Sequence, residues 1–184
     1  MTEKLSAALD KVEMTYKDLV EIANGMLDPM FAPINDLVSR ISANVNALPI
    51  DQIRNYILEL QLKAFEISEI KEKATLKADL AEAIQREQFA ISFNGMDGSA
   101  AVKDKLALVA TSSEVLAETL YNLIANLLKT KIDQVHRLVD AMKSVLMSRM
   151  QETKFMNVGA SGEIPGTTNG RVILNESASE KPVF

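Results

Sequence analysis

The segment Phe93-Asn94-Gly95-Met96-Asp97-Gly98-Ser99 contains the only two glycines between Asp51 and Phe155, and no proline occurs in that range. Apolar residues recur at helical spacing on both sides of it. Glycine, asparagine and aspartate favour turns and helix ends over helix interiors. The sequence therefore predicts two long helices that meet at this segment and fold back on each other as an antiparallel helical hairpin.

The helix before the segment carries apolar residues at alternating steps of four and three, which is the seven-residue pattern of a coiled coil. Lys71 is the one polar interruption of this pattern. The positions are Ile53, Ile57, Leu60, Ala64, Ile67, Ala74, Ala78 and Ala81. Leu58, Leu62 and Phe65 form a second apolar stripe beside the first, so we expect the beginning of this helix to be buried on two sides.

The helix after the segment has no glycine or proline from Ser99 to Asn157, which predicts one continuous element. Its stripe first follows Val102, Leu106, Val109, Leu116, Leu120, Leu123 and Leu127. It then passes to Leu128, Ile132, Val135, Val139, Met142, Leu146 and Met150. The predicted seam, serving the core or an oligomer, comprises Ile57, Leu60, Ile67, Leu116, Leu120, Leu123 and Leu127. Leu123, at its middle, is expected to be fully buried.

Shorter segments flank the predicted hairpin. Residues 1–50 indicate two short helices, about Ser6–Asn24 and Pro33–Ala47, because Gly25 and the Asp28-Pro29 pair interrupt the helical pattern. Residues 156–184 form a Gly-rich tail. Its short apolar run, Val172, Ile173 and Leu174, is consistent with disorder or with a strand or plug that docks on a partner. Residues 51–155 are the predicted oligomerisation core.

Composition supports an all-α fold without an active site. The 184 residues are 47% hydrophobic and 5% aromatic, with nine methionines, no cysteine and one histidine, which suits helix-on-helix packing. No phosphate-binding loop, nucleophile motif or metal-ligand spacing occurs, so we predict neither enzymatic activity nor a cofactor nor a metal. No apolar run is long enough to span a membrane. The expected location is the cytoplasm.

Positive charge is concentrated in one region of a chain whose net charge is −5. Residues 129–154 carry six basic and three acidic side chains. The candidate phosphate-contacting residues are Lys129, Lys131, Arg137, Lys143 and Arg149, accompanied by His136. The alternative interpretation is a solvated helix face whose cations favour a helix C-terminus.

Four segments in the middle of the chain carry a resemblance, namely Leu76-Lys77-Ala78-Asp79, the loop at Gly95-Met96-Asp97-Gly98, and the later runs Leu138–Ser144 and Phe155–Gly159. In these segments the chain resembles the small helical recombination-mediator proteins of T-even-type phages. It covers residues 63–159 and implies a ring-forming protein that binds single-stranded DNA and helps to load a recombinase. The chain departs from that family in its acidic charge, its additional N-terminal residues and its Gly-rich tail.

A second likeness is carried by Glu118–Lys143, Val158-Gly159 and the tail from Asn169 to Glu180. In this layout the chain is similar to phage small terminase subunits, which implies a role in DNA packaging beside a large terminase. A third interpretation is a virion structural or connector protein whose tail docks on neighbouring subunits. All three imply a non-enzymatic homo-oligomer, located in the host cytoplasm or in the virion if the protein is phage-encoded.

Overall fold

The computed structural model describes residues 2–44 and 47–161. This part of the chain contains four α-helices and no strand. The helices are α1 (Thr2–Asn44), α2 (Ile50–Gly95), α3 (Ala100–Ala110) and α4 (Ser112–Ser161). The all-α prediction is therefore confirmed. The chain divides into two units, Met1–Leu146 and Met147–Phe184, and the packing described below lies within the first.

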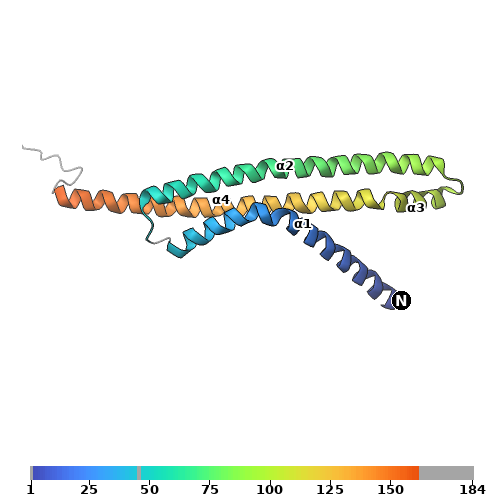
Figure 1. The fold of residues 1–184 in the computed structure, drawn as a ribbon, viewed down its shortest axis with the longest axis horizontal. Helices are drawn as coiled ribbons and strands as arrows, with labels where there is room; N and C mark the ends of the chain where they lie inside the picture. Colours follow the sequence, from blue (N-terminus) through green and yellow to red (C-terminus); the bar gives the residue numbers. More distant parts are fainter. Residues whose placement is uncertain (1, 45–46, 162–184) are drawn as a thin grey trace, which may run out of the picture. The chain divides into compact units, whose positions relative to one another are not determined.

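One stripe of α2 is buried and holds the helix against its neighbours. It runs alongside α3 and the first part of α4 in the opposite direction (Figure 1). Its buried residues are Ile53, Leu60, Ala64, Ile67, Ala74, Ala78 and Ala81, all of them positions of the seven-residue pattern. Because alanine has a short side chain, the later part of this stripe allows close helix packing.

The connection between α2 and α3 depends on Gly98. Its φ of 127° lies where side chains other than glycine's are strained, and an added Cβ would lie 3.6 Å from Val102 Cγ1. The next residue, Ser99, accepts hydrogen bonds through its carbonyl oxygen from the backbone N–H groups of Val102 and Lys103, at 2.9 and 3.0 Å. The chain therefore turns at Gly98 and begins α3 at once.

The predicted continuous helix after Ser99 is interrupted at Thr111, which ends α3 and precedes α4. Thr111 is fully buried, and its hydroxyl donates a hydrogen bond of 3.1 Å to the carbonyl oxygen of Ala107. The prediction of one continuous element was wrong at this residue, where the backbone departs from the helical conformation with φ −103° and ψ 14°.

The two predicted N-terminal helices are one helix, α1, with Pro29 and Pro33 inside it. A proline inside a helix costs about 3 kcal/mol, through a missing hydrogen bond and a clash with the carbonyl four residues earlier. Both prolines and Gly25 are exposed, so water can reach the carbonyls that lack a partner. The buried stripe continues past them through Ala23, Leu27, Ile34, Leu37 and Ile41. Burial of this stripe outweighs the cost of the prolines, and α1 bends instead of ending (Figure 1).

The core is formed where α1, α2 and α4 meet. The second half of α1 contributes residues from Ala23 onward, α2 contributes residues from Ile53 to Ala74, and α4 contributes residues from Ile124 to Met142. The fully buried α4 side chains include Leu128, Val135 and Val139. α1 is thus the third helix of a bundle and covers apolar surface that α2 and α4 would otherwise leave exposed.

The residues that are buried after Ser99 are not those of the predicted apolar seam. Ala107 and Thr111 are buried, whereas Leu116 is exposed and Leu123 is only half-buried. The prediction that Leu123 is fully buried was wrong, because its neighbours Ile124 and Leu128 occupy the space between the three helices. Of the other seam residues, Leu60 and Ile67 are buried, and Ile57, Leu120 and Leu127 are half-buried.

α4 continues past Phe155 to Ser161, beyond the predicted start of the tail. Val172, Ile173 and Leu174 lie outside the described residues. Among the described helices, none has an apolar stretch of the length and composition that a membrane span requires.

Leu128 should contribute more to stability than Leu123. Because Leu128 has no exposed surface, we expect Leu128→Ala to lower the free energy of unfolding by about 2–5 kcal/mol. Leu123→Ala is the matched control, since it removes the same atoms from a half-buried site of the same helix, and it should cost less. Chemical denaturation of both variants at the same concentration measures the difference. A larger effect of Leu123→Ala would contradict the assignment of the core.

Candidate functional site

The described part of the chain contains no cluster of three or more histidine, cysteine, aspartate or glutamate side chains that could hold a metal ion. The candidate sites are therefore surfaces, namely the basic region of α4, a pocket at the connection from α1 to α2, and the apolar stripes that the chain leaves exposed.

The basic residues of α4 do not share one face. Lys131 and Arg137 are six residues apart, which places them roughly 120° apart around a helix. Asp133 and Asp140 are exposed within the same stretch. Lys143 Nζ lies 3.2 Å from Asp140 Oδ1, so its charge is partly neutralised. Lys129, His136 and Lys143, at steps of seven, share one side of the helix, whereas Lys131 lies on another side.

Lys131 joins α4 to α1. Its Nζ donates a hydrogen bond of 2.5 Å to Asn35 Oδ1 and lies 5.3 Å from the centre of the Phe31 ring, within the range of a cation–π contact. Burial lowers the pKa of Lys131 from its usual value of 10.5 because desolvation disfavours the charged form. Lys131 therefore links α4 to α1, which makes it less available for contact with a phosphate.

Two of the five predicted contacts remain exposed without a hydrogen bond or ion pair in the described structure, Lys129 and Arg137. Arg149 is half-buried and belongs to the second unit. His136 is exposed beside Arg137. Any phosphate-contacting surface of the first unit is therefore smaller than the sequence indicated.

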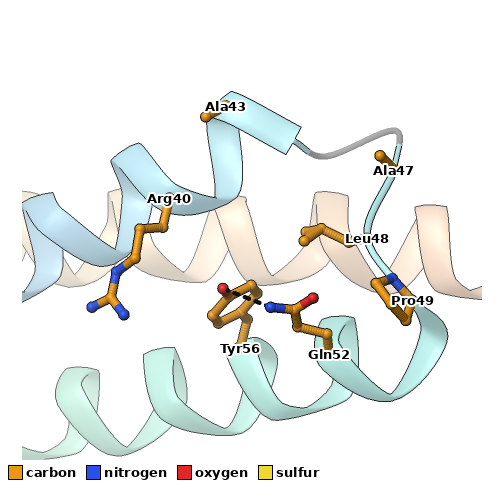
Figure 2. Close-up of a pocket in the computed structure, with 7 residues that line it drawn as sticks. All are labelled: Arg40, Ala43, Ala47, Leu48, Pro49, Gln52 and Tyr56. Atoms are coloured by element: carbon orange, nitrogen blue, oxygen red, sulfur yellow. Dashed lines mark hydrogen bonds between the residues drawn. The ribbon is translucent and has the colours of Figure 1, made fainter.

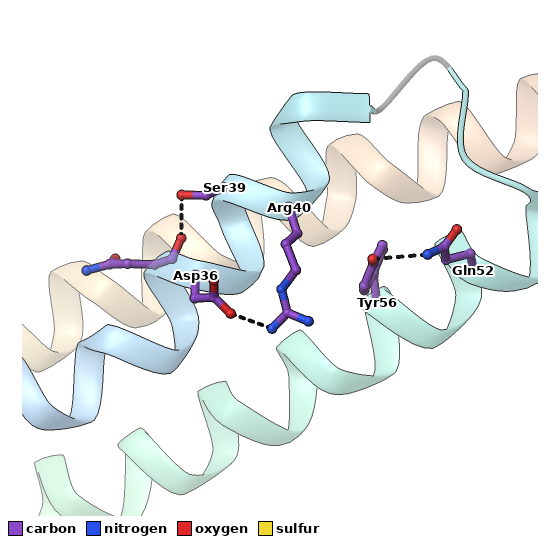
Figure 3. Close-up of polar contacts among 6 residues, drawn as sticks. Asp36, Ser39, Arg40, Gln52 and Tyr56 are labelled. Atoms are coloured by element: carbon purple, nitrogen blue, oxygen red, sulfur yellow. Dashed lines mark hydrogen bonds and ion pairs between the residues drawn. The ribbon is translucent and has the colours of Figure 1, made fainter.

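A pocket of about 470 Å³ lies at the connection from α1 to α2 (Figure 2). Its polar lining is largely paired internally. Gln52 Nε2 donates a hydrogen bond of 3.1 Å to the Tyr56 hydroxyl, and Arg40 pairs with Asp36 at 2.6 Å, as Figure 3 shows. The Ser39 hydroxyl also donates to the backbone carbonyl of Asn35. These contacts pair most of the polar side-chain groups near the pocket. The arrangement is typical of a surface depression at a turn between helices.

Exposed apolar side chains are more informative, because they recur at helical spacing on several helices. On α2, Leu58, Leu62 and Phe65 are 57%, 56% and 66% exposed. They were expected to be buried, but α1 packs against a different side of α2. Leu76 and Leu80 continue this outer face. One chain therefore leaves two apolar groups on this face of α2 uncovered, separated by Glu69 and Glu72.

The first half of α1 and the region formed by α3 and the start of α4 carry two further exposed stripes. On α1 the exposed apolar residues include Leu9, Val12 and Tyr16. On α3 and α4 they include Val102, Leu106, Val109, Val115 and Leu116. The α3–α4 stripe contains the early seam positions that the sequence placed in a contact, and within one chain they face solvent.

Sequence reasoning missed the roles of Asn35 and Phe31. Both contact Lys131, and Asn35 is 96 residues away from it in the chain. No local pattern marks such a pair, since its members are brought together only by the packing of α1 on α4. No protein-family model, curated protein or solved structure matches this chain.

Asn35 and Lys131 should be energetically coupled. In a double-mutant cycle with Asn35→Ala and Lys131→Met, which keeps most of the apolar stem, we expect a coupling free energy of about 0.5–1.5 kcal/mol. Lys129→Met is the control, because Lys129 makes no such contact, and its effect should add to that of Asn35→Ala. Urea denaturation provides the four free energies. Additive effects for Asn35 and Lys131 would show that the contact does not hold α1 on α4.

Proposed function

We propose that this protein is a non-enzymatic, self-associating helical subunit whose function depends on a homo-oligomer. The exposed stripe of Leu58, Leu62 and Phe65 on α2 supports this most directly. Large apolar side chains at helical spacing on an outer helix face are typical of a surface that another helix covers. The two further exposed stripes, on α1 and on α3 with α4, also support self-association.

We also propose, as a second candidate, that the oligomer assists phage-type DNA metabolism in the manner of a recombination mediator, with single-stranded DNA and a recombinase as partners. Exposed Lys129 and Arg137, within a region of net positive charge, favour this candidate. A small terminase subunit would instead bind a large terminase and bind duplex DNA weakly. A virion connector would be found in purified particles, with its tail docked on neighbouring subunits.

Self-association should weaken when a carboxylate enters the α2 stripe. We expect Leu62→Glu to raise the dissociation constant of the oligomer at least about tenfold, equivalent to about 1.4 kcal/mol, because an unpaired charge would be buried. Gln88→Glu adds the same charge at an exposed position of α2 outside this stripe and should have little effect. Sedimentation velocity over a concentration series measures both. A wild-type chain that stays monomeric at tens of micromolar would refute the proposed function.

Single-strand binding should depend on Lys129 and Arg137. We expect the Lys129→Glu, Arg137→Glu double variant to bind more weakly, with the magnitude of the salt slope lower by about 0.7 for each phosphate that is no longer neutralised. Lys73→Glu with Lys105→Glu changes charge equally at two other exposed positions and serves as the control. Fluorescence anisotropy across a salt series measures affinity and slope. Equal affinities and slopes for the two double variants would remove the mediator candidate.

A further inference from the structure

An open groove of about 360 Å³ separates the first half of α1 from the beginning of α4 in the same chain. Its apolar walls are Val12, Tyr16 and Leu19 on one side and Leu116 on the other. Protein interiors are close-packed, with few voids larger than a water molecule. The groove is therefore a contact between two helices of this chain that is only partly formed.

Exposed apolar side chains continue beyond the groove on both walls. Leu9 and Val12 of α1 are 60% and 66% exposed, and Leu106 and Val109 of α3 are 47% and 71% exposed. Both stripes have the seven-residue spacing of helix-packing faces, with Leu9, Val12, Tyr16 and Leu19 on α1, and Val102, Leu106, Val109 and Leu116 on α3 and α4.

The groove continues an interface that is already formed further along α1. From Ala23 onward α1 belongs to the core that it shares with α2 and α4, and Asn35 accepts the hydrogen bond from Lys131. Toward its N-terminus α1 diverges from α3 and α4 (Figure 1). The same pair of helices is therefore in contact after Ala23 and open before it.

The bend of α1 lies where a helix resists a change of direction least. Pro29 and Pro33 have no backbone N–H, so the carbonyl oxygens of Gly25 and Pro29 lose the helix hydrogen bonds that those groups would donate. A Cβ added at Gly25 would meet no atom within 4 Å, which shows that this part of the bend is unobstructed. The angle between the two halves of α1 can therefore change with the loss of few further hydrogen bonds.

We propose that Thr2–Ile22 is a strap that closes onto α3 and the beginning of α4 of its own chain. Closure brings the two stripes together and extends the three-helix core toward the α2–α3 connection. The removal of both stripes from water drives it. Because the strap is covalently joined to the surface that it covers, closure does not depend on protein concentration.

The strap controls how much apolar surface the protein offers to another subunit. In the open form that the structure records, both stripes are accessible. In the closed form they cover each other, and the exposed group of Leu58, Leu62 and Phe65 on α2 remains. Closure and self-association through the α1 or α3–α4 stripe therefore exclude each other. This consequence, unlike closure itself, rests on the proposed self-association.

Pulsed electron paramagnetic resonance can measure closure, because the chain has no cysteine of its own and takes spin labels only where cysteines are introduced. Labels at Asp10→Cys and Asp104→Cys occupy exposed positions outside both stripes. The labelled full-length protein is mixed with a large excess of unlabelled wild type, so that only distances within one chain are recorded. We expect two distances, of which the shorter comes from the closed form.

Substitutions in either stripe should deplete the shorter distance. We expect Val12→Asp to lower the ratio of closed to open chains at least about tenfold, because a carboxylate would enter an apolar contact. Val109→Asp should act in the same way from the opposite wall, and since Val109 is 71% exposed the core is unaffected. Met14→Asp is the control, because Met14 is exposed on another side of α1, and it should change the ratio by no more than about twofold.

A single distance that none of these substitutions changes would overturn the strap. A short distance that disappears in the excess of unlabelled protein would also overturn it, because the contact would then lie between copies. Sedimentation velocity of the wild type tests the proposed self-association separately. A monomer that shows the short distance would support the strap and refute the oligomer, whereas an oligomer without the short distance would refute the strap alone.

Discussion

The packing of the second half of α1 against α2 and α4 is the interaction on which the rest of the described structure depends. Two helices that run side by side can bury only one stripe each, and α2 and α4 carry apolar residues on more than one side. By lying along both, α1 completes a core around Leu128. Where α1 diverges, only two helices remain side by side, and large apolar side chains face solvent. The same constraint therefore explains the core and the exposed stripes of α1 and of α3 with α4, whereas the stripe of Leu58, Leu62 and Phe65 is exposed because α1 packs on another side of α2.

α1 illustrates how packing overrides local preference. Gly25, Pro29 and Pro33 each disfavour a helix interior, yet α1 is one helix through all three. Its buried stripe supplies the compensating free energy, and the exposed position of the prolines limits the cost. The prolines still influence the structure, because they bend the helix whose first half carries the exposed Leu9, Val12 and Tyr16.

Packing also determines which basic side chains of α4 are available to bind a phosphate. Along the sequence, Lys129, Lys131, Arg137 and Lys143 form one basic region, whereas on the helix Lys131 lies on a different side from the other three and the side chains make different contacts. Lys131 contacts Asn35 and Phe31, and Lys143 pairs with Asp140. A charged side chain that holds two helices together has less freedom to bind a phosphate. The surface available for nucleic acid is therefore reduced to the neighbourhood of Lys129 and Arg137.

The sequence by itself determined the helical class and the buried stripe of α2, because both follow from a periodicity that is read within a few turns. It also located the turn at Gly98, since the unusual φ there favours glycine. Only the tertiary structure decided which side of α3 and α4 is buried, because apolar residues occupy two sides and the choice depends on where α1 lies. It likewise decided that α1 is continuous and that Lys131 contacts Asn35, since packing free energy and contacts between distant residues leave no local pattern in the chain.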